Sequence, residues 1–333
     1  MRCPTLAELP PPPPGRVGWP WTVAAEPATT EVALPRVTIV TPSFNQGAYL
    51  EETLRSVLLQ GYPDLEYIVI DGGSTDESVG IIQKYAPWLT YWVSERDRGQ
   101  ADAINKGFRR ATGAFVNWLN SDDVFYPGAL HDTVAFLDRH PDVDFVYRDV
   151  EQGWERERVE LRRGEAIAYP EMIRTFQMPI PQQACLWRRS IMDRVGLLDP
   201  KWHVVLDREF FMRIGLHGRL AYAPGVVGYF RLHGASKSIA EERHWLQEIP
   251  QLYAEFFARP DLPEPIRRLR GEATSAAYIF CARIARGHGA PLDAMRWIVK
   301  AVASYPAALK KLFRWGPAQV LQEAAAFFRR QRG

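Results

Sequence analysis

Apolar and polar positions follow two alternating periods along the first third of the chain, and this alternation predicts the fold. Short β-branched and aromatic runs are typical of buried strands, and apolar residues three and four apart are typical of helices. The predicted strands cover residues 37–41, 65–70, 89–93 and 115–119. Helices are predicted between them, over 49–58, after a Ser74–Glu77 capping box, and over 100–111. This order predicts an α/β fold with a mostly parallel sheet and helices on its faces.

The pattern changes in the later part of the chain. Residues 149–165 are charged and show no period, which predicts an irregular segment. The elements predicted around it are helices over 128–139, 170–176, 190–195 and 206–214, and strands over 143–147 and 220–232. From residue 241 the pattern is helical throughout, with helices predicted over 245–257, 266–286, 292–304 and 307–330. A C-terminal helical region therefore follows the α/β domain.

The first 34 residues differ from the rest in composition. Pro10 to Pro14 form an unbroken proline run, which is typical of polyproline II or of disorder. We predict a flexible lead that Trp19 and Trp21 could dock onto the body of the protein. The predicted organisation is thus a lead over 1–34, an α/β domain over 35–238 and a helical region over 239–333.

Composition narrows the class of protein. The 333 residues carry a formal net charge of only +2, which does not favour nucleic acid as a partner. The three cysteines lie far apart, so neither a disulfide framework nor a zinc site is expected, and a reducing, cytoplasmic location fits. Neither a signal peptide nor an apolar run of about 18 residues is present in the sequence given. The basic, aromatic C-terminal helices could contact the inner face of a membrane, cap the catalytic body or form a dimer face.

Candidate chemistry lies where the predicted strands end. Asn120, Ser121, Asp122 and Asp123 follow the strand 115–119. Two adjacent carboxylates at a buried strand end favour a hard divalent cation, Mg²⁺ or Mn²⁺, although Asp is also favoured in any turn that starts a helix. Ser43 with Asn45, and Asp71, end two other strands, and ligands bind at the carboxyl ends of the strands in such sheets. Since neither GxGxxG nor GxxxxGK[ST] occurs, a bound pyrophosphate would be held through a metal.

Two later segments add candidates. Asp207 stands in the first turn of a predicted helix, where a carboxylate is either a simple helix-end acid or a base directed at the site. The segment from Arg231 to Ser238 gathers Arg, His, Ser and Lys in one loop after a strand, a composition suited to a diphosphate. Aromatic residues near these segments could stack on a ligand or form the core, namely Trp118, Trp154, Trp187 and Trp202.

These motifs together resemble the inverting glycosyltransferases of family 2, which have the GT-A fold. The resemblance covers about residues 36–238. It rests on four segments in the expected order: Thr38–Asn45, Tyr67–Asp76, Ser94–Gly107 and Asn120–Asp123. The last of these stands where the family has its DxD motif. The chain departs from the family pattern at Asn120, the first position of that motif, and at Leu206, where the family often has an acid.

The resemblance implies a role for each position. Asp71 would bind the nucleotide base near Pro42, Ser43 and Asn45. Asp97, Arg98 and Asp102 would line the nucleotide or diphosphate side. Asn120, Asp122 and Asp123 would hold the ribose and a Mn²⁺ or Mg²⁺ ion, and His233 would supply a further metal ligand. Arg231 and Ser236 would close on the diphosphate, and Asp207 would be the general base.

The function implied is transfer of a sugar, with inversion, from a nucleoside-diphosphate sugar to an acceptor hydroxyl. UDP is the nucleotide most frequent in the family, and a saccharide or glycolipid acceptor in polysaccharide or glycoconjugate synthesis fits it. One alternative is a non-catalytic scaffold that keeps the fold and binds partners through its lead and tail. Another is a nucleotidyltransferase, which is disfavoured because the turn after the first strand lacks Lys and Arg.

Overall fold

The protein is described by a computed structural model, which covers residues 3–26, 34–155, 158–237 and 241–308. The chain divides into two compact units. The first unit comprises Met1–Ala166 and Pro179–Ser236, and the second, the helical unit, comprises Ile167–Met178 and Lys237–Gly333. The segment 167–178, which the sequence pattern placed in the α/β domain, therefore belongs with the C-terminal helices.

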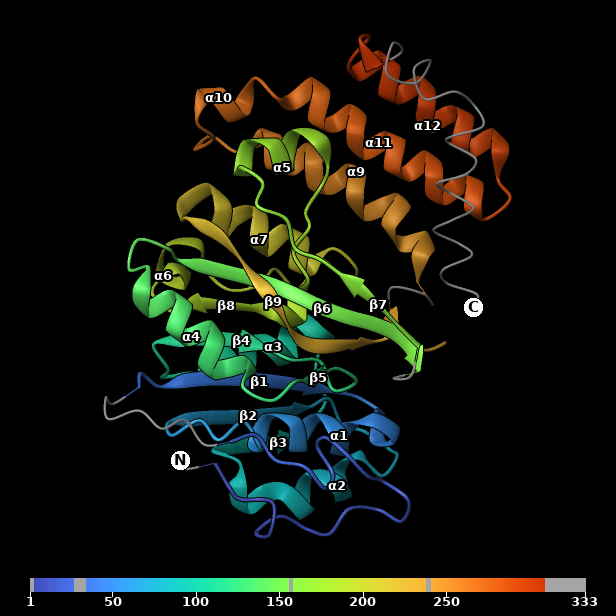
Figure 1. Cartoon of the computed structure of the whole chain (residues 1–333). Coiled ribbons are helices and arrows are strands. Elements are labelled where there is room, and N and C mark those ends of the chain that lie inside the picture. The colour runs from blue at the N-terminus through green and yellow to red at the C-terminus, as the bar shows by residue number, and fades with distance from the viewer. Residues whose placement is uncertain (1–2, 27–33, 156–157, 238–240, 309–333) are drawn as a thin grey trace. The chain divides into compact units, whose positions relative to one another are not determined.

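A mixed nine-stranded sheet forms the centre of the first unit (Figure 1). The strand order is β3-β2-β1-β4-β8-β6-β9-β5, and β7 pairs with β6. The strands are β1 Val37–Ser43, β2 Leu65–Asp71, β3 Tyr91–Ser94, β4 Phe115–Trp118, β5 Val124–Phe125, β6 Phe145–Glu155, β7 Arg158–Arg162, β8 Cys185–Arg188 and β9 Leu220–Arg231. The four strands from β3 to β4 in this order pair in parallel, which confirms the predicted α/β architecture.

Helices cover both faces of the parallel strands, which explains the unbroken apolar runs of the sequence. All positions of β1 and β2 are buried. The helices of this unit are α1 Gly47–Leu58, α2 Ser78–Tyr85, α3 Gln100–Phe108, α4 Ala129–Arg139, α6 Ile191–Val195 and α7 Leu206–His217. Helix α3 lies so close to β1 that a Cβ at Gly107 would stand 2.4 Å from Cγ1 of Val40. Glycine at this position permits the close approach of helix and strand.

The parallel register brings several strand ends to one edge of the sheet. Ser43 at the end of β1 is paired with Asp71 at the end of β2. On the other side of β1, Val40 is paired with Trp118, the last residue of β4. The loop after β4 therefore begins beside the last residues of β1.

The charged segment that we predicted to be irregular forms a hairpin instead. Strand β6 runs on to Glu155, and β7 pairs with it in antiparallel register, Val150 opposite Arg162. Because most β7 positions are exposed, its side chains need not be apolar, and the strand has no periodic pattern. Backbone hydrogen bonds to β6, rather than burial, hold this strand.

Aromatic side chains fill the core between α7 and the sheet. Trp118 and Trp187 stand with ring centroids 5.7 Å apart, and Phe211 packs against Phe145 at 4.9 Å. Trp118, Trp187 and Trp202 are all buried, so they belong to the core rather than to a sugar-binding surface. Trp154 is 37% exposed and is the one of the four predicted candidates that reaches solvent.

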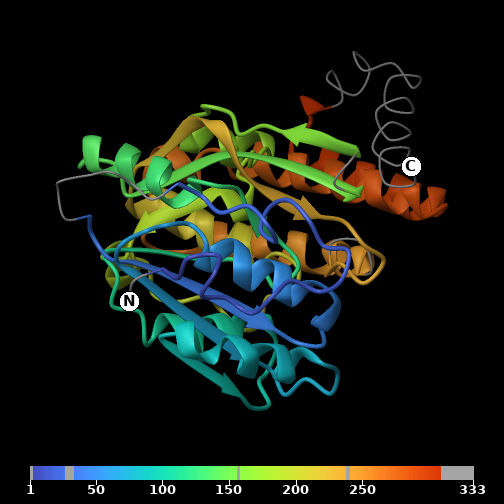
Figure 2. The same ribbon diagram turned by 60° about the horizontal axis from the view of Figure 1, so that its bottom comes forward.

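The described part of the Pro-rich lead runs beside α1 (Figure 2). Buried polar contacts to α1 hold it there. The guanidinium of Arg55, which is fully buried, donates hydrogen bonds to the carbonyls of Pro10, Pro20 and Trp21. Trp19 Nε1 donates to the carbonyl of Phe125 over 2.7 Å, as its predicted docking role requires. A buried guanidinium needs several acceptors, and the lead supplies them.

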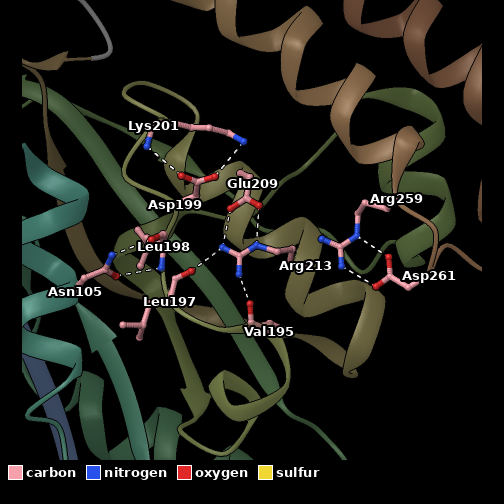
Figure 3. Close-up of polar contacts among 10 residues, drawn as sticks. All are labelled: Asn105, Val195, Leu197, Leu198, Asp199, Lys201, Glu209, Arg213, Arg259 and Asp261. Atoms are coloured by element: carbon pink, nitrogen blue, oxygen red, sulfur yellow. Dashed lines mark hydrogen bonds and ion pairs between the residues drawn. The ribbon is translucent and has the colours of Figure 1, made fainter.

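The helical unit contains α5 Tyr169–Thr175, α9 Glu242–Ala258, α10 Glu264–Arg267, α11 Arg270–Gly287 and α12 Pro291–Ser304. Arg174 of α5 pairs with Glu272 of α11 at 2.6 Å, and Arg259 pairs with Asp261 after α9 (Figure 3). Most of the helix predicted over 307–330 lies outside the described residues. No helix within the described ranges has the length and apolar character needed to cross a membrane.

Candidate active site

The loop Asn120–Asp123, named the acid loop below, joins β4 to β5 and is fixed from two sides. Thr53 of α1 donates its hydroxyl to the carbonyl of Asp123 over 2.7 Å. The backbone N–H of Arg231, the last residue of β9, donates to Oδ1 of the same residue over 3.1 Å. Strand β5, which follows the loop, also pairs with β9. The acid loop is therefore positioned by α1 and β9 together.

Asp123 is fully buried, and donors of the chain itself satisfy its carboxylate. Besides Arg231, its Oδ2 accepts hydrogen bonds from Gln183 Nε2 at 3.0 Å and Asn120 Nδ2 at 3.2 Å. Burial, together with the neighbouring Asp122, raises the pKa of Asp123 well above its usual range. These contacts fix Asp123 within the acid loop, and its predicted role as a metal ligand stays a prediction.

Asn120 links Asp123 to a group of carboxamide side chains. Its Oδ1 accepts from Gln100 Nε2 at 2.8 Å, while its Nδ2 donates to Asp123. Gln182 continues the group by donating to the carbonyl of Trp118 over 2.7 Å. An amide can accept from Gln100 and donate to Asp123 at once, whereas an ionised carboxylate could only accept and would repel Asp123. This accounts for the departure from the family pattern at this position.

Asp122 and His233 form the pair that is open to a metal. Their Oδ2 and Nε2 atoms are 3.0 Å apart, and the side chains are 17% and 11% exposed. Tyr49 packs on the imidazole with ring centroids 4.5 Å apart, and the hydroxyl of Ser236 accepts the backbone N–H of His233. A carboxylate oxygen beside an imidazole nitrogen fits Mn²⁺ or Mg²⁺ if diphosphate and water oxygens complete the shell. Within the described ranges, no three acidic, His or Cys side chains gather around one point.

Arg231 and Ser236 lie beside the Asp122–His233 pair and contact other parts of the protein. The guanidinium of Arg231 pairs with the buried Glu52 at 2.8 Å and donates to the carbonyl of Asp122 at 3.0 Å. Ser236 closes the turn that carries His233. Both residues fix the position of the Asp122–His233 pair, and their predicted contacts with a diphosphate stay predictions.

The loops after β1 and β2 are tied to each other. Asn45 adopts a positive φ of 52°, its N–H donates to Ser74 Oγ, and its Oδ1 accepts from Thr75 N at 2.8 Å. Ser74 donates its hydroxyl to Asp71 over 2.5 Å, so the predicted capping box with Glu77 does not form. Asp71 is fully buried and also accepts from Ser94 Oγ at 2.7 Å.

Ser43 and Phe44, where β1 leads into α1, differ from their neighbours in hydrogen bonding and in exposure. Among the described residues, Ser43 Oγ is buried without a hydrogen-bond partner. Phe44, beside it, is 59% exposed, although Pro42 and Ser43 are buried. The sequence contains no signal for Phe44, because an aromatic residue in a strand–helix turn is usually buried in the core. An exposed ring beside an unpartnered hydroxyl is a candidate for ligand contact.

The loop before α3 lies against the end of β2. A Cβ at Gly72 would stand 2.6 Å from Asp97 Oδ2, so the carboxylate of Asp97 lies directly on this backbone. Asp102 accepts hydrogen bonds from the N–H of Arg98 at 3.2 Å and from its Nη2 at 3.3 Å. Burial by itself would raise the pKa of Asp102. The hydrogen bonds and the positive charge of Arg98 outweigh burial, so the pKa lies below its usual value. Asp71, Asp97 and Asp102 thus lie around adjoining loops, and their predicted contacts with a nucleotide stay predictions.

Asp207 stands in the first turn of α7, and an ionic network fixes this helix. Arg213 pairs with Glu209 on the same helix and donates to the carbonyls of Val195 and Leu197 (Figure 3). Asn105 of α3 exchanges two hydrogen bonds with the backbone of Leu198, at 2.8 and 3.1 Å. The segment leading to α7 is therefore held from both sides.

The carboxylate of Asp207 is half-buried, and it accepts the N–H of Arg208 over 2.7 Å. Burial raises the pKa of Asp207, and the positive charges of Arg208 and Arg162 oppose this rise. A raised pKa moves a carboxylate toward the range in which it exchanges protons with hydroxyl groups. Nearby, burial and Asp207 raise the pKa of the Cys185 thiol, so this cysteine stays protonated and is not a nucleophile.

Arg162 is an exposed residue at the end of β7. Its Cζ atom lies 6.0 Å from the centre of the Phe230 ring, and Phe230 precedes Arg231 on β9. The positive charge of Arg162 opposes the rise in the pKa of Asp207. The sequence pattern did not point to this arginine, because the β6–β7 register decides its position.

Comparison with known proteins agrees with this arrangement. The model of the family "Glycosyl transferase family 2" matches residues 38–196. An uncharacterized glycosyltransferase of Mycobacterium tuberculosis (strain ATCC 25618 / H37Rv) is 32% identical over 187 residues, which span 55% of this chain and 70% of that protein. A PGL/p-HBAD biosynthesis glycosyltransferase of Mycobacterium bovis (strain BCG / Pasteur 1173P2) is 29% identical over 225 residues, 66% of this chain and 86% of that protein.

Solved structures show the same fold. TarS 1-349 of S. aureus, in complex with UDP-GlcNAc, has a TM-score of 0.64 at 18% identity, covering 87% of this chain and 89% of that one. The mannosyltransferase PcManGT of Pyrobaculum calidifontis, in complex with GDP-Man and Mn²⁺, has a TM-score of 0.61 at 21% identity, covering 93% and 88%. The fold is the GT-A fold of glycosyltransferases. The chain belongs to glycosyl transferase family 2 and is a glycosyltransferase.

Proposed function

We propose that this glycosyltransferase transfers a sugar, with inversion, from a nucleoside-diphosphate sugar to an acceptor hydroxyl. The observation that carries the proposal is the Asp122–His233 pair, whose Oδ2 and Nε2 atoms are 3.0 Å apart after the end of β4. Asp207, a carboxylate whose pKa is raised by burial, supports the proposal as the candidate base. One residue suited to removing a proton and one pair suited to the leaving diphosphate are the two parts that such a reaction needs.

The donor nucleotide would lie over the loops after β1 and β2. The exposed ring of Phe44 offers a face for the base, and the unpartnered hydroxyl of Ser43 offers a hydrogen bond. Asp71 and Asn45 hold these loops in place, and Asp97, Arg98 and Asp102 lie around the adjoining loop. The solved relatives with UDP-GlcNAc and with GDP-Man support a nucleotide-sugar donor, and UDP is our first choice by its frequency in the family.

Asp122 and His233 would hold a Mn²⁺ or Mg²⁺ ion. When bound, the ion supplies positive charge that neutralises the diphosphate as it leaves. Arg231 and Glu52 contribute by fixing the acid loop and the His233 turn, so that the two ligands stay side by side. Asp123 keeps the loop closed through its buried hydrogen bonds.

Asp207 would act as general base on the acceptor. Its carboxylate takes the proton of the acceptor hydroxyl while the hydroxyl oxygen attacks the anomeric carbon from the face opposite the diphosphate. The bond to the diphosphate oxygen breaks in the same step, so the configuration inverts and no covalent intermediate forms. The positive charges of Arg208 and Arg162 oppose the rise in its pKa and so favour the ionised carboxylate. A saccharide or glycolipid acceptor is proposed, supported by the relative named for PGL/p-HBAD biosynthesis.

Thermal unfolding of the full chain with UDP, GDP or dTDP, each with and without Mn²⁺, tests the donor site. A nucleotide present at about 100 times its dissociation constant adds roughly 2.7 kcal/mol of stability. We expect a metal-dependent shift with one nucleotide, lost in Asp122→Asn. No shift with any nucleotide would reject the donor site and favour the scaffold alternative.

The same assay separates the base from the donor site. Asp207→Asn should keep the nucleotide shift but lose sugar transfer by about 100-fold or more, because the proton acceptor is gone. Asp193→Asn, an exposed carboxamide substitution on α6, is the matched control and should leave both readouts unchanged. Transfer that survives Asp207→Asn would show that another group removes the proton.

A further inference from the structure

Helix α12 has one face packed in the helical unit and a second apolar face in solvent. Ala294 and Ala301 are buried, and the helix packs along α11 (Figure 1). On the outer face, Leu292, Met295 and Val299 are 78%, 59% and 61% exposed. Their spacing of three and four residues places them in one line along the helix. An apolar line of this kind is unusual on a protein surface and marks a site of contact.

Basic side chains border this apolar line, which we name the α12 stripe. Arg296 is 77% exposed, and Lys300 stands 4.3 Å from the centre of the Trp297 ring. Asp293, which is also exposed, pairs with Arg296 at 2.9 Å. The charge of the wider region has the same sign. Residues 237–333 contain 16 of the 41 Lys and Arg and 9 of the 39 Asp and Glu, so they carry a net +7 while the rest of the chain carries −5.

We propose that the α12 stripe docks on an anionic lipid surface. A helix with an apolar face and a basic border lies in the plane of a membrane, with its apolar side chains inserted among the headgroups. Its cations are attracted by the negative surface potential of acidic lipids, each with a gain of about fivefold in partitioning. The charge asymmetry of the chain would turn the helical unit, rather than the acidic remainder, toward the lipid.

Charge and area disfavour the other occupants of this face. A second copy would bring Arg296 and Lys300 against their own equivalents, and like charges facing each other oppose such a contact. Three side chains also offer far less than the roughly 800 Å² per partner of a stable interface. Residues 309–333 contain six Lys and Arg and one Glu, so their charge also opposes binding beside a basic border. Acidic lipid is the occupant whose charge is complementary.

Vesicle co-sedimentation of the full chain tests this proposal. The vesicles are phosphatidylcholine alone, or phosphatidylcholine with phosphatidylglycerol, and no nucleotide or metal is added. We expect binding to the anionic vesicles only, and weaker binding in about 1 M salt, where the Debye length falls to about 3 Å. Nucleotide binding is measured separately by thermal shift. Failure of vesicle binding would therefore leave the proposed transferase reaction standing, and the reverse also holds.

Two variants and a control localise the contact. Leu292→Ser with Met295→Ser and Val299→Ser should reduce binding at least tenfold, because the inserted side chains are lost. Arg296→Gln with Lys300→Gln, which changes only exposed positions, should reduce it by about 25-fold at low salt. Val17→Ser is the control, because it removes an apolar side chain of the first unit that is 76% exposed, close to the 78% of Leu292. This variant should bind vesicles like the original chain. Unchanged thermal midpoints show that each variant is folded.

Several results would overturn the proposal. One is an absence of anionic-vesicle binding by the original chain, and another is full binding by both stripe variants. A concentration-dependent dimer that disappears in the serine variant, measured by light scattering, would assign the stripe to a second copy. Removal of residues 309–333 could also increase the exposure of the stripe, measured by binding of an apolar dye. That result would show that this segment, rather than lipid, covers the stripe.

Discussion

At the scale of single residues, the site is organised by amides and cations that hold its carboxylates. The carboxylate of Asp123 accepts hydrogen bonds from three donors. Asp122 and His233 stand side by side, and contacts on either side fix their positions. The sequence identified most of these acids, since each ends a strand or starts a helix. It contains no signal for the internal partners of Asp123 and Arg231, because these partners come from distant parts of the chain.

The substitution Asn120→Asp tests the role of the amide group at residue scale. The new carboxylate would face Asp123, and the Nδ2 donor would be lost, so we expect a loss of about 1–3 kcal/mol in unfolding free energy at neutral pH. Repulsion raises the folded pKa of the pair above the unfolded value. The folded state then binds more protons, and the penalty decreases as pH falls through the folded pKa.

Urea unfolding near neutral pH and at mildly acidic pH measures this difference. Asn120→Ala is the control, because it removes the same donor without adding charge. Its loss of stability should therefore change little with pH. If the Asp and Ala variants depend on pH in the same way, repulsion between the carboxylates is not the cause.

Arg162→Gln tests the effect of the positive charge of Arg162 on Asp207. Without this positive charge the pKa of Asp207, already raised by burial, should rise further. The base works only when ionised, so activity is lost as pH falls through this pKa. The acid limb of kcat/KM should therefore move to higher pH. Arg158→Gln, at an exposed position of the same strand, is the control. An unmoved acid limb would mean that Arg162 does not act on Asp207.

At the scale of elements, close contacts between helices and strands decide the geometry of the site. The parallel strands were readable from the sequence, because a strand buried on both faces is an apolar run. The β6–β7 hairpin was not, since exposed strands carry no such pattern and their pairing depends on a partner distant in the sequence. The position of Arg162, opposite Val150, is set by that pairing. The shift of α5 into the helical unit likewise rests on long-range contacts, such as that between Arg174 and Glu272.

Gly107→Ala tests the approach of α3 to β1. The added Cβ would lie 2.4 Å from Val40 Cγ1, and overpacking of this kind costs about 1–3 kcal/mol, more than the gain in helix propensity of up to about 1 kcal/mol. In α2, a Cβ added at Gly80 would meet no neighbouring atom within 4 Å. Gly80→Ala should therefore stabilise the protein through its higher helix propensity. Thermal unfolding should therefore give opposite signs for the two variants. Val40→Ala should restore part of the loss in Gly107→Ala, and a stabilising Gly107→Ala would contradict the packing described here.

At the scale of the whole molecule, the chain joins an acidic catalytic unit to a basic helical one. The division of charge is a property of the sequence. It supports the proposal that the exposed α12 stripe docks on an acidic lipid surface. The lead also belongs to this scale. Its proline run predicted flexibility, yet over its described residues the buried Arg55 binds three of its carbonyls. Local composition contains no information about an arginine that lies later in the chain.

The sequence by itself determined the class of fold, the edge of the sheet where the site lies, and the acids at the strand ends. These features follow from local periodicity and from the rule that parallel strands end at a common edge. The tertiary structure decided which acids are satisfied internally, which cations act on Asp207, and which helix face remains in solvent. Each of these depends on contacts between residues far apart in the chain. A side chain's chemistry is set by the partners that such contacts bring to it.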